Sequence, residues 1–521
     1  MHYDVAVIGA GMAGQVTANY LARAGKRVLM LEQNHHAGGN MSGFTRGGFY
    51  FDGGDQSFES MGVVFPVLRD LLGVGPDDFI KARYRMVSSD FDFFVDSPEQ
   101  VEHELRSAFP DEPGIAPLFR EVKEVSRFLS AHYDPWEFPL LIRGGARNTA
   151  RYGARLAPWL PQLKKWSTFR YREQACSVIR DPALRQWFSQ IGYYRMPYLF
   201  FAGFWHIWAH DYWYPRGGMQ SLHDRLTSAF RAHGGEALFN TDVTRINLDS
   251  SGRRAVSVDT ADGEHYEADR FVYAGDYKAL VNSVLGPDVF PPRYVARIND
   301  ATLTEEIVGV YLGLSMDDDE LSGHLGGAHH PFYFPNYRVV FPNPSSPEDV
   351  HRTMWVALNH FGSQSPSAPP GKSTLTLQTY SSFAWQDYWK NGSASHRRTP
   401  EYREFKQRVG MELVELAENL VPGLRERIEF MDVGTPLSSE RFSRNTNGST
   451  GGWCYDDQVS PVWRLPSLNR IRTPIRNVLC AGHYALWPGG VISAAYCGRM
   501  VARMLGAGSR ERDRAGAGSG G

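Results

Sequence analysis

Short apolar runs separated by glycine turns open this chain. Residues Tyr3–Ile8 form an apolar and β-branched run, which is typical of a strand buried in a parallel sheet. A glycine-rich turn follows, and then a helical stretch to Ala24, where Gly25 provides a C-terminal stop. A second apolar run covers Arg27–Leu31. The pattern predicts a strand, a glycine turn, a helix and a second strand, in that order.

Related patterns return in the middle and near the end of the chain. Two strand patterns, Ala255–Thr260 and Arg270–Tyr273, flank the turn signal Asp262-Gly263. Later, Val478–Ala481 predicts a buried strand, and a glycine-rich loop leads from it into an amphipathic helix over Ile492–Leu505.

The glycine spacing of the first turn indicates a dinucleotide site. Gly9 permits the tight turn, Gly11 lets the backbone approach a pyrophosphate, and Gly14 lets the helix lie close to the sheet. The helix N-terminus offers free N–H groups to the phosphates. Glu32, 18 residues after Gly14, has the spacing of an acid that accepts hydrogen bonds from a ribose diol and disfavours a 2′-phosphate. The residues expected at this site are Gly9, Ala10, Gly11, Met12, Ala13, Gly14, Glu32 and Gln33.

A second glycine pair distinguishes between dinucleotides. Gly38-Gly39 follows shortly after Glu32 and precedes a further glycine-rich segment, Phe44–Gly54. Such a pair indicates another close backbone approach to the same cofactor. An NAD-binding domain would continue to its next strand–helix unit, so the spacing favours FAD.

Composition excludes several other classes of protein. Of the 521 residues, 42% are hydrophobic and 21% are charged, which argues against disorder, and a net charge of −2 argues against a nucleic-acid-binding polycation. The longest apolar run, Met196–Ala209, has 14 residues, fewer than the roughly 18–20 that span a bilayer. The four cysteines are scattered, so we expect neither a disulfide framework nor a metal site, and a cytoplasmic location is the simpler interpretation.

Further motifs follow in a fixed order along nearly the whole chain. After Gly38-Gly39, the segment Phe44–Gly54 carries Arg46, Gly48-Phe49 and Phe51-Asp52. The later motifs are Tyr214–Met219, Gly234-Gly235, Asn240–Ile246, Thr435-Pro436, Asn447–Ser449, Gly452-Trp453, Asn477–Gly482 and Pro488–Val491. Together they resemble the flavin amine-oxidase-like superfamily, and within it the carotenoid (phytoene) desaturase and carotenoid isomerase branch.

This resemblance implies a fold and a domain organisation. The expected class is α/β, with a Rossmann-type FAD-binding domain of the glutathione-reductase or amine-oxidase type, interleaved with a mixed α+β substrate domain. Residues 1–70, 215–280 and 425–505 would form the discontinuous FAD-binding domain. Residues 71–214 and 281–424 would form the substrate domain, and residues 506–521 are expected to be a disordered tail.

The resemblance also implies which residues contact the flavin and move protons. The expected additional FAD contacts are Gly38, Gly39, Asn40, Arg46, Gly54, Asp55, Val243, Ala274, Gly275, Gly482, Gly490, Val491 and Ile492. The chain departs from the family at Asn40, where relatives often have arginine, and in the polar segments Asp55–Glu59 and His483–Trp487. The expected catalytic residues are Asp55, Glu59, His483 and Tyr484. At the closing segment, a helix N-terminus aimed at the flavin would stabilise negative charge on its reduced form.

One stretch is densely aromatic and follows a basic one. Ten aromatic residues lie between Trp187 and Trp213, and eight basic residues without an acid lie from Arg143 to Arg172. Three interpretations stay open: an aromatic-walled tunnel for a long conjugated substrate, peripheral attachment to an anionic membrane, and an aromatic core with a solvated basic face. His206 and His210 are expected to lie in the core or tunnel wall rather than to bind a metal.

The resemblance implies an FAD-dependent oxidoreductase that acts on a large hydrophobic polyene. Desaturation, isomerisation and reductive cyclisation stay open, with NADPH as an external hydride donor. The polar segment at Asp55 and the loop at His483 favour an oxygenated polyene of secondary metabolism, such as a polycyclic tetramate macrolactam precursor, over a carotenoid. A non-catalytic prenyl or lipid carrier and an amine oxidase are the competing classes. The first would not need the glycine cradle, and the flavin-linking cysteine of the second is missing from His483–Gly490.

Overall fold

The first layer of the molecule is a mixed sheet built around the N-terminal strand. The computed structural model describes residues 2–54, 56–193, 195–339, 355–362, 368–381, 389, 399–455 and 470–507. The strands of this sheet are β1 (His2–Ile8), β2 (Val28–Leu31), β9 (Glu236–Leu238), β10 (Val243–Leu248), β11 (Ala255–Thr260), β12 (His265–Tyr273) and β18 (Val478–Cys480). Strand β1 lies between β2 and β12 and is parallel to both, with Val5 opposite Val28 and Val7 opposite Val272. Val5 and Val7 are almost completely buried, which explains the continuous apolar run.

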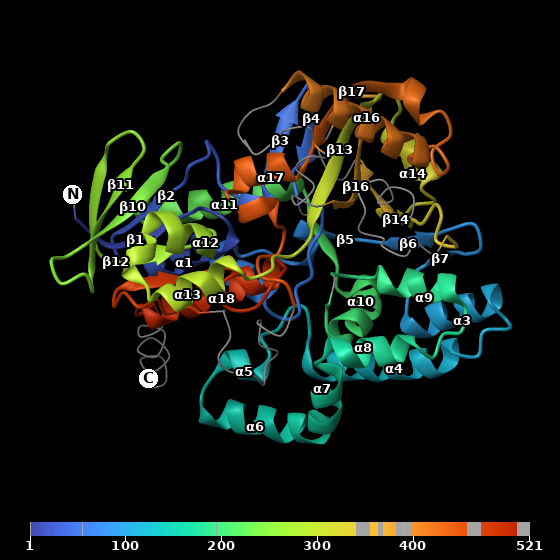
Figure 1. Ribbon diagram of the computed structural model, residues 1–521, viewed down its shortest axis with the longest axis horizontal. Helices are drawn as coiled ribbons and strands as arrows, with labels where there is room; N and C mark the ends of the chain where they lie inside the picture. Colours follow the sequence, from blue (N-terminus) through green and yellow to red (C-terminus); the bar gives the residue numbers. More distant parts are fainter. Residues whose placement is uncertain are drawn as a thin grey trace, which may run out of the picture.

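Helices from the beginning, the middle and the end of the sequence pack against this sheet (Figure 1). They include α1 (Met12–Arg23), α2 (Val64–Leu72), α11 (Gly218–Ala232), α12 (Tyr277–Ala279), α13 (Pro292–Asn299) and α18 (Val491–Met504). Helices α1 and α18 approach closely, because a Cβ on Gly498 would lie 2.5 Å from the carbonyl oxygen of Ala13. The Thr17 hydroxyl lies within hydrogen-bond distance of the Ala13 and Gly498 carbonyl oxygens, at 2.8 and 3.1 Å.

A second sheet, also of seven strands, lies beside the first. Its order is β17-β13-β16-β15-β14-β6-β7, with bounds β17 (Ile428–Gly434), β13 (Glu306–Leu314), β16 (Ser373–Ser381), β15 (Val356–Asn359), β14 (His330–Tyr333), β6 (Tyr84–Val87) and β7 (Asp92–Phe94). Helices α14 (Asp318–His324), α16 (Pro400–Ala417) and α17 (Pro436–Ser443) accompany it. Strand β17 belongs to residues 425–505 of the expected FAD-binding domain, yet it pairs with β13 in this second sheet.

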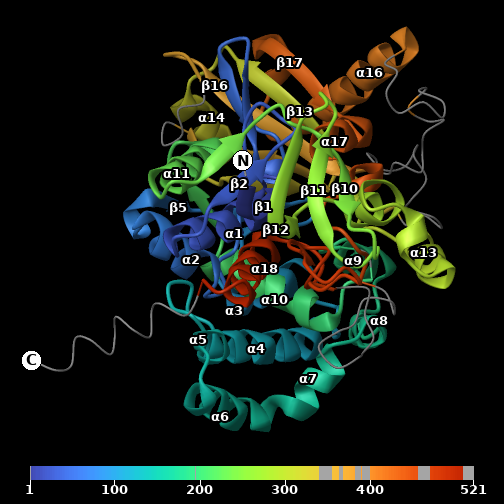
Figure 2. The ribbon, with the colours of Figure 1, turned by 90° about the vertical axis from the view of Figure 1, so that its left-hand side faces the viewer.

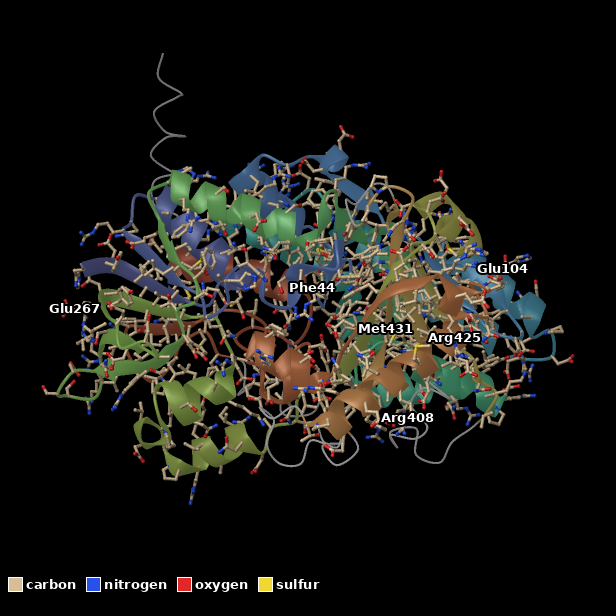
Figure 3. All side chains as sticks on the ribbon, turned by 90° about the horizontal axis from the view of Figure 1, so that it is seen from above. Phe44, Glu104, Glu267, Arg408, Arg425 and Met431 are labelled. Atoms are coloured by element: carbon tan, nitrogen blue, oxygen red, sulfur yellow. The ribbon has the colours of Figure 1, made fainter. Side chains whose placement is uncertain are left out.

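Two short antiparallel pairs connect these layers. One is the hairpin of β3 (Gly43–Arg46) and β4 (Phe49–Asp52), and the other joins β5 (Phe79–Lys81) to β8 (Trp213–Pro215). Phe44 and Phe51 of the hairpin pack on Tyr311 of β13, with ring centroids 5.0 and 5.7 Å apart. Seen from above, Phe44 lies near the middle of the molecule, between Glu267 of the first sheet and Glu104 of the helical part (Figure 3).

A helical region covers the remaining side of the second sheet. Its helices are α3 (Pro98–Ala108), α4 (Ile115–His132), α5 (Leu140–Arg143), α6 (Ala146–Leu156), α7 (Leu160–Trp166), α8 (Phe169–Cys176), α9 (Pro182–Ser189) and α10 (Tyr198–His210). Helix α6 lies at the outer edge of this region and contains no buried residue (Figure 2). Among the described residues, no helix combines the length and the apolar character that crossing a bilayer requires.

Candidate functional site

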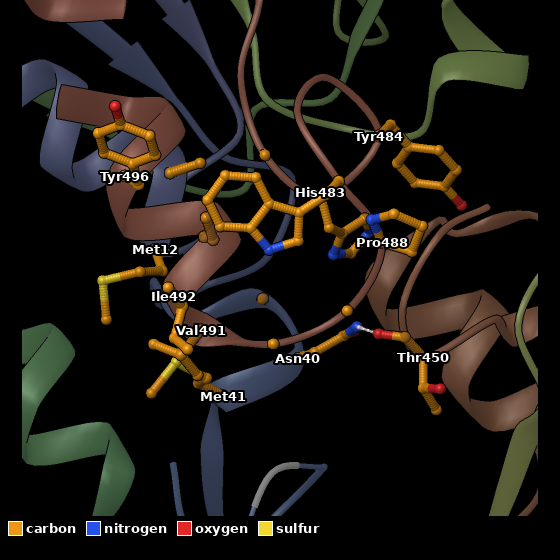
Figure 4. A pocket seen from close by; sticks show the side chains of 18 of the residues that line it. Met12, Asn40, Met41, Thr450, His483, Tyr484, Pro488, Val491, Ile492 and Tyr496 are labelled. Carbon is orange, nitrogen blue, oxygen red and sulfur yellow. Dashed lines mark hydrogen bonds between the residues drawn. The ribbon is translucent and has the colours of Figure 1, made fainter. Parts of the chain in front are cut away.

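A cavity of about 1650 Å³ joins the first sheet to the helical region. At one end it is lined by the glycine turns that follow β1 and β2, and at the other by apolar residues of α4, α8 and α10. Figure 4 shows Met12, Met41, Val491 and Ile492 gathered on one side of it, and His483 with Pro488 on the other. Residues that are far apart in the sequence therefore face one space.

The turn between β1 and α1 has the geometry of a phosphate cradle. Gly9 has φ +100°, a conformation that side chains disfavour. Gly14 packs so tightly on this turn that a Cβ would lie 1.9 Å from the Gly9 carbonyl oxygen. Gly11 is different, because a Cβ there would meet only the Cα of Gly39, at 3.9 Å. The protein leaves room at Gly11, so the glycine is explained by a ligand that approaches its backbone.

The second glycine pair is joined to the first turn. The Gly38 N–H donates to the Ala10 carbonyl at 3.0 Å, and Gly11 and Gly38 form an isolated parallel bridge. Gly38 has φ +134° and Gly39 has φ +58°, so both adopt the left-handed side of backbone space. This linkage supports the expectation that both turns approach the same ligand.

Glu32 sits at the end of β2 and braces the same turn. Its Oε2 accepts the Ala10 N–H at 2.7 Å, and its Oε1 accepts the N–H and the side-chain amide of Asn34 at 2.9 and 3.0 Å. Burial raises the pKa of this carboxyl, while these hydrogen bonds oppose the rise. Because a carboxylate oxygen has two lone pairs, Oε2 can still accept a hydroxyl from the cavity.

The sequence did not identify the residues that close over Gln33. Arg444 follows α17 and donates from Nε to Gln33 Oε1 at 2.6 Å and from a terminal nitrogen to Asp242 Oδ2 at 3.1 Å. The Gln33 amide in turn donates to the Phe442 carbonyl at 3.1 Å. Phe442 and Arg444 lie between the motifs Thr435-Pro436 and Asn447–Ser449, and these two motifs were the sequence signal that could have located them.

The closing segment places the start of α18 at the cavity. Gly482, Gly489 and Gly490 have φ values of +112°, +79° and +64°. The Gly489 N–H donates to the Gly451 carbonyl at 2.8 Å, and the Tyr455 hydroxyl donates to the Pro488 carbonyl at 2.6 Å. The loop is therefore fixed from outside, and no side chain caps the N-terminus of α18 or that of α1. Both helices therefore begin at the cavity with uncapped N–H groups, and such groups stabilise negative charge.

The residues of this site fit a flavin dinucleotide. The open space at Gly11 suits a pyrophosphate, Glu32 suits a ribose diol, and the start of α18 suits the polar edge of a ring system. Of the expected contacts, those that line the cavity are Gly9, Gly11, Met12, Ala13, Glu32, Gln33, Gly38, Gly39, Asn40, Val243, Ala274, Gly275, Gly482, Gly490, Val491 and Ile492. Asn40 is held by the Thr450 carbonyl, to which its amide donates at 3.2 Å (Figure 4).

Four other expected contacts do not line the cavity. Ala10 and Gly14 act through the geometry of the turn, as described above. Arg46 points outward from β3 and pairs with Asp432 of β17. Gly54 packs on the backbone of Asn40, since a Cβ there would lie 2.4 Å from the Asn40 carbonyl oxygen. The structure thus gives Arg46 and Gly54 contacts within the protein, and Asp55 lies outside the described residues.

Three of the four expected proton carriers, Glu59, His483 and Tyr484, line the cavity. Glu59 lines it, and a Cβ on Gly490 would lie 2.7 Å from Glu59 Oε1, so this carboxylate lies against the start of the helix. His483 also lines it, and burial lowers the pKa of His483 to about 4, so its imidazole is neutral near pH 7. Tyr484 lines the cavity as well, but its hydroxyl donates to Asp276 Oδ2 at 2.9 Å and so joins the closing segment to the segment after β12.

The aromatic stretch divides between core and cavity wall. Tyr193, Phe200, Phe204 and Tyr212 line the cavity. The fully buried members that belong to the core are Trp187, Phe188, Tyr198, Phe201 and Trp205. His206 is buried beside Ser126, whose hydroxyl lies 2.8 Å from its ring nitrogen. Within the described part of the chain, no cluster of histidine, cysteine and acidic residues could hold a metal ion.

Comparison with known proteins identifies the family. The model of the family described as flavin containing amine oxidoreductase matches residues 12–505. The chain belongs to this family. The protein is accordingly an FAD-dependent oxidoreductase, and FAD is its cofactor. Membership supports the expected enzyme over the alternative of a carrier without redox activity.

Relatives with assigned names share about a quarter of their residues with this chain. The zebrafish (Danio rerio) all-trans-retinol 13,14-reductase is 23% identical over 96% of this chain and 86% of its own length. The prolycopene isomerase 1 of an Oncidium hybrid cultivar is 25% identical over 97% of this chain and 84% of its own length. The chain is therefore similar along its whole length to a reductase and to an isomerase.

Solved structures show the same fold. An oxidoreductase from Methanosarcina mazei superimposes with a TM-score of 0.57 at 14% identity, covering 96% of this chain and 100% of that protein. Putrescine oxidase bound to putrescine gives a TM-score of 0.57 at 16% identity, covering 97% of this chain and 99% of that protein. These matches confirm the expected α/β class with an FAD-dependent amine-oxidase-type architecture.

Proposed function

We propose that this oxidoreductase acts on a large conjugated polyene that carries oxygen atoms, by desaturation or reductive cyclisation, as in the formation of a tetramate macrolactam. The observation that carries the proposal is the continuity of the cavity, which runs from the glycine cradle to the apolar side chains of α4 and α10. Its volume of about 1650 Å³ exceeds the roughly 300–1,000 Å³ of an ordinary ligand pocket. A dinucleotide and a long second molecule can therefore share it.

The apolar arm suits a conjugated chain. Phe200, Phe204 and Tyr193 present ring faces and edges to the cavity, and Leu129 and Ile207 supply aliphatic surface. Aromatic walls exclude water and stack on extended π-systems. The named relatives support the same class, because retinol and prolycopene are both conjugated polyenes.

The residues around α18 would position and protonate the substrate. A flavin bound here supplies reversible two-electron chemistry at its ring. The carboxylate of Glu59 lies against Gly490 and can hold or release a proton at its Oε1 atom. Neutral His483 can donate one hydrogen bond and accept another, which suits orientation of a carbonyl or hydroxyl. The outer brace of Tyr455 on Pro488 keeps this loop in place.

Incubation with polyenes tests the proposal and separates the reactions. The holoenzyme is incubated with oxygenated and hydrocarbon polyenes, with and without NADPH, and the masses of the products are measured by mass spectrometry. Loss of two hydrogens indicates desaturation, gain of two indicates reductive cyclisation, and no change with altered retention indicates isomerisation. We expect Glu59→Gln to lower turnover by about 10²-fold or more while retaining flavin, because a positioned proton carrier is lost.

The matched control is Glu173→Gln, because Glu173 lines the same cavity at its exposed end. This variant is expected to turn over like the parent protein. Hydrogen peroxide release with amines, and no conversion of any polyene, would contradict the proposed function and favour an amine oxidase.

We further propose that α6 brings the cavity to an anionic membrane surface, from which an apolar substrate can enter. Arg147, Arg151 and Arg155 recur every four residues on this helix and are all exposed. Leu141 beside the helix is 49% exposed and also lines the cavity, as does Tyr152 of α6. Basic side chains each contribute about 1 kcal/mol of attraction to anionic lipid.

Vesicle sedimentation measures this attachment. The protein is expected to sediment with vesicles of phosphatidylcholine and phosphatidylglycerol but not with phosphatidylcholine alone. Changing Arg147, Arg151 and Arg155 together to glutamine should weaken binding about 100-fold, from the loss of about 3 kcal/mol. A control with equal loss of charge changes the exposed Arg231, Arg245 and Arg293 to glutamine and should bind normally. Equal binding by both triple variants would refute attachment through α6.

A further inference from the structure

Arg195 places a positive charge in the apolar arm of the cavity. It lies in the loop between α9 and α10 and lines the cavity beside Phe169, whose ring centroid is 5.9 Å from the guanidinium carbon. Its backbone has φ +58°, which is rare for a residue with a side chain and indicates that the surrounding structure imposes this conformation. Tyr193, two residues earlier, lies on the other side of the same loop, 3.7 Å from the position of a Cβ on Gly489. The loop thus extends from the closing segment to the helical end of the cavity.

The side chain of Arg195 is half-buried, and one of its donors has no partner among the described residues. Its Nε atom is buried without a hydrogen-bond partner among them, and none of the ion pairs in the described part of the chain includes Arg195. Arginine stays protonated in proteins and cannot escape this cost by losing its charge. A buried donor without a partner is costly, so Nε calls for an acceptor beyond the described residues, and a ligand in the cavity can supply one.

A neighbouring arginine shows how this fold satisfies a guanidinium that has a structural role. Arg172 of α8 is only 4% exposed, and one of its terminal nitrogens donates to the carbonyls of Phe188, Ser189 and Ile191 at 3.2, 3.1 and 2.7 Å. Its other terminal nitrogen donates to the Tyr193 carbonyl at 3.4 Å. Arg172 therefore fixes the loop that carries Arg195, and the second arginine is left to face the cavity.

We propose that the substrate carries a planar anionic oxygen group, a carboxylate or the enolate of an acidic dicarbonyl, and that Arg195 binds it. The planar fork of a guanidinium matches two coplanar oxygens, and the apolar surroundings strengthen the pairing. This inference rests on the proposed function, since it names the substrate class of the same cavity. It makes Arg195 a specificity-determining residue that distinguishes acidic polyenes from neutral ones and from hydrocarbons.

Matched neutral and acidic polyenes test this assignment on the flavin-loaded protein. The probes are all-trans-retinol, all-trans-retinoic acid and the saturated palmitate, with bound probe measured by equilibrium dialysis. We expect retinoic acid to bind about tenfold or more tighter than retinol, as for a charge-assisted hydrogen-bonded pair. In Arg195→Met this preference should vanish while retinol affinity and flavin content stay unchanged, and Arg195→Lys should retain part of it.

Arg170→Met is the matched control, because Arg170 also lines the cavity but is exposed on α8. It should keep the preference for the acid. Equal binding of retinol and retinoic acid by the parent protein, a uniform loss in Arg195→Met, or no binding of any probe would overturn the assignment. If palmitate binds with the same dependence on Arg195 while neither retinoid binds, the anion site stands and the proposed polyene substrate fails.

Discussion

Replacing Gly14 with alanine is expected to abolish flavin retention and to destabilise the protein by about 3 kcal/mol or more. The new methyl group would lie 1.9 Å from the Gly9 carbonyl oxygen, which is backbone and cannot rotate away. The turn between β1 and α1 must then open, and this displaces both Gly11 and the Ala10 N–H that Glu32 accepts. Visible absorbance of the purified protein and its thermal unfolding measure the two effects.

Gly11→Ala separates ligand approach from folding in the same experiment. The methyl group has room in the flavin-free protein and the backbone angle of Gly11, φ −70°, suits alanine. Stability without flavin should therefore change by less than about 0.5 kcal/mol, while flavin affinity falls. Gly153→Ala in α6, where nothing lies within 4 Å of the new methyl group, is the control for flavin affinity, which it should leave unchanged while stabilising the helix by about 0.5–1 kcal/mol. Flavin retention by Gly14→Ala at the parent level would show that the cradle is misassigned.

Acidification is expected to destabilise the protein strongly between pH 7 and pH 5. Burial lowers the pKa of four histidines below the value of 6.5 that they have in the unfolded chain. These pKa values fall to about 4 for His206 and His329 and to about 3 for His223 and His330. The unfolded chain thus binds more protons than the native state, so this stability is present above pH 6.5 and is lost as the pH falls.

Two buried carboxyls act in the opposite direction. Burial raises the pKa of Asp52 and of Asp211 to about 6 from 3.8, so their contribution is present at low pH and is lost as the pH rises through about 6. The histidines with a lowered pKa, which include His483, outnumber the carboxyls with a raised pKa, so stability falls on acidification near pH 5.5 by at least about 1.4 kcal/mol per pH unit. Denaturant unfolding at pH 7, 6 and 5 measures this slope.

A single substitution checks the origin of the slope. His206→Gln should reduce it by about 1.4 kcal/mol per pH unit, because one titrating group is removed. His233→Gln should leave it unchanged, since His233 is exposed. A stability that is constant from pH 7 to pH 5 would refute the account.

The parts of the site that the sequence predicted are those governed by local geometry. The turn at Gly9–Gly14, the acid Glu32 and the start of α18 each depend on a few adjacent residues with distinctive conformations. Strand and helix limits agree to within a few residues for β11 and α18, because their apolar spacing is regular. Family resemblance supplied the order of the segments.

Long-range contacts were beyond the reach of the same reasoning. Arg444 donates a hydrogen bond to Gln33, which lies 411 positions earlier in the chain, and no local sequence pattern predicts this contact. Arg46 was expected at the flavin but pairs with Asp432, which lies on a strand from another part of the chain. Helix α10 is apolar on most of its surface, so periodicity could not distinguish the core residue Trp205 from the cavity residue Phe204. Arg195 lacked a signal because its isolation follows from tertiary structure.

The contact between Thr17 and Gly498 has a consequence for biosynthesis. Thr17 and Gly498 lie 481 positions apart, on the two helices whose N-termini face the cavity, so α18 is synthesised long after α1. A nascent chain that lacks α18 therefore has only one of the two helix N-termini that line the cavity. Flavin binding must therefore wait until α18 has been synthesised, and any fragment that stops before α18 is expected to be colourless.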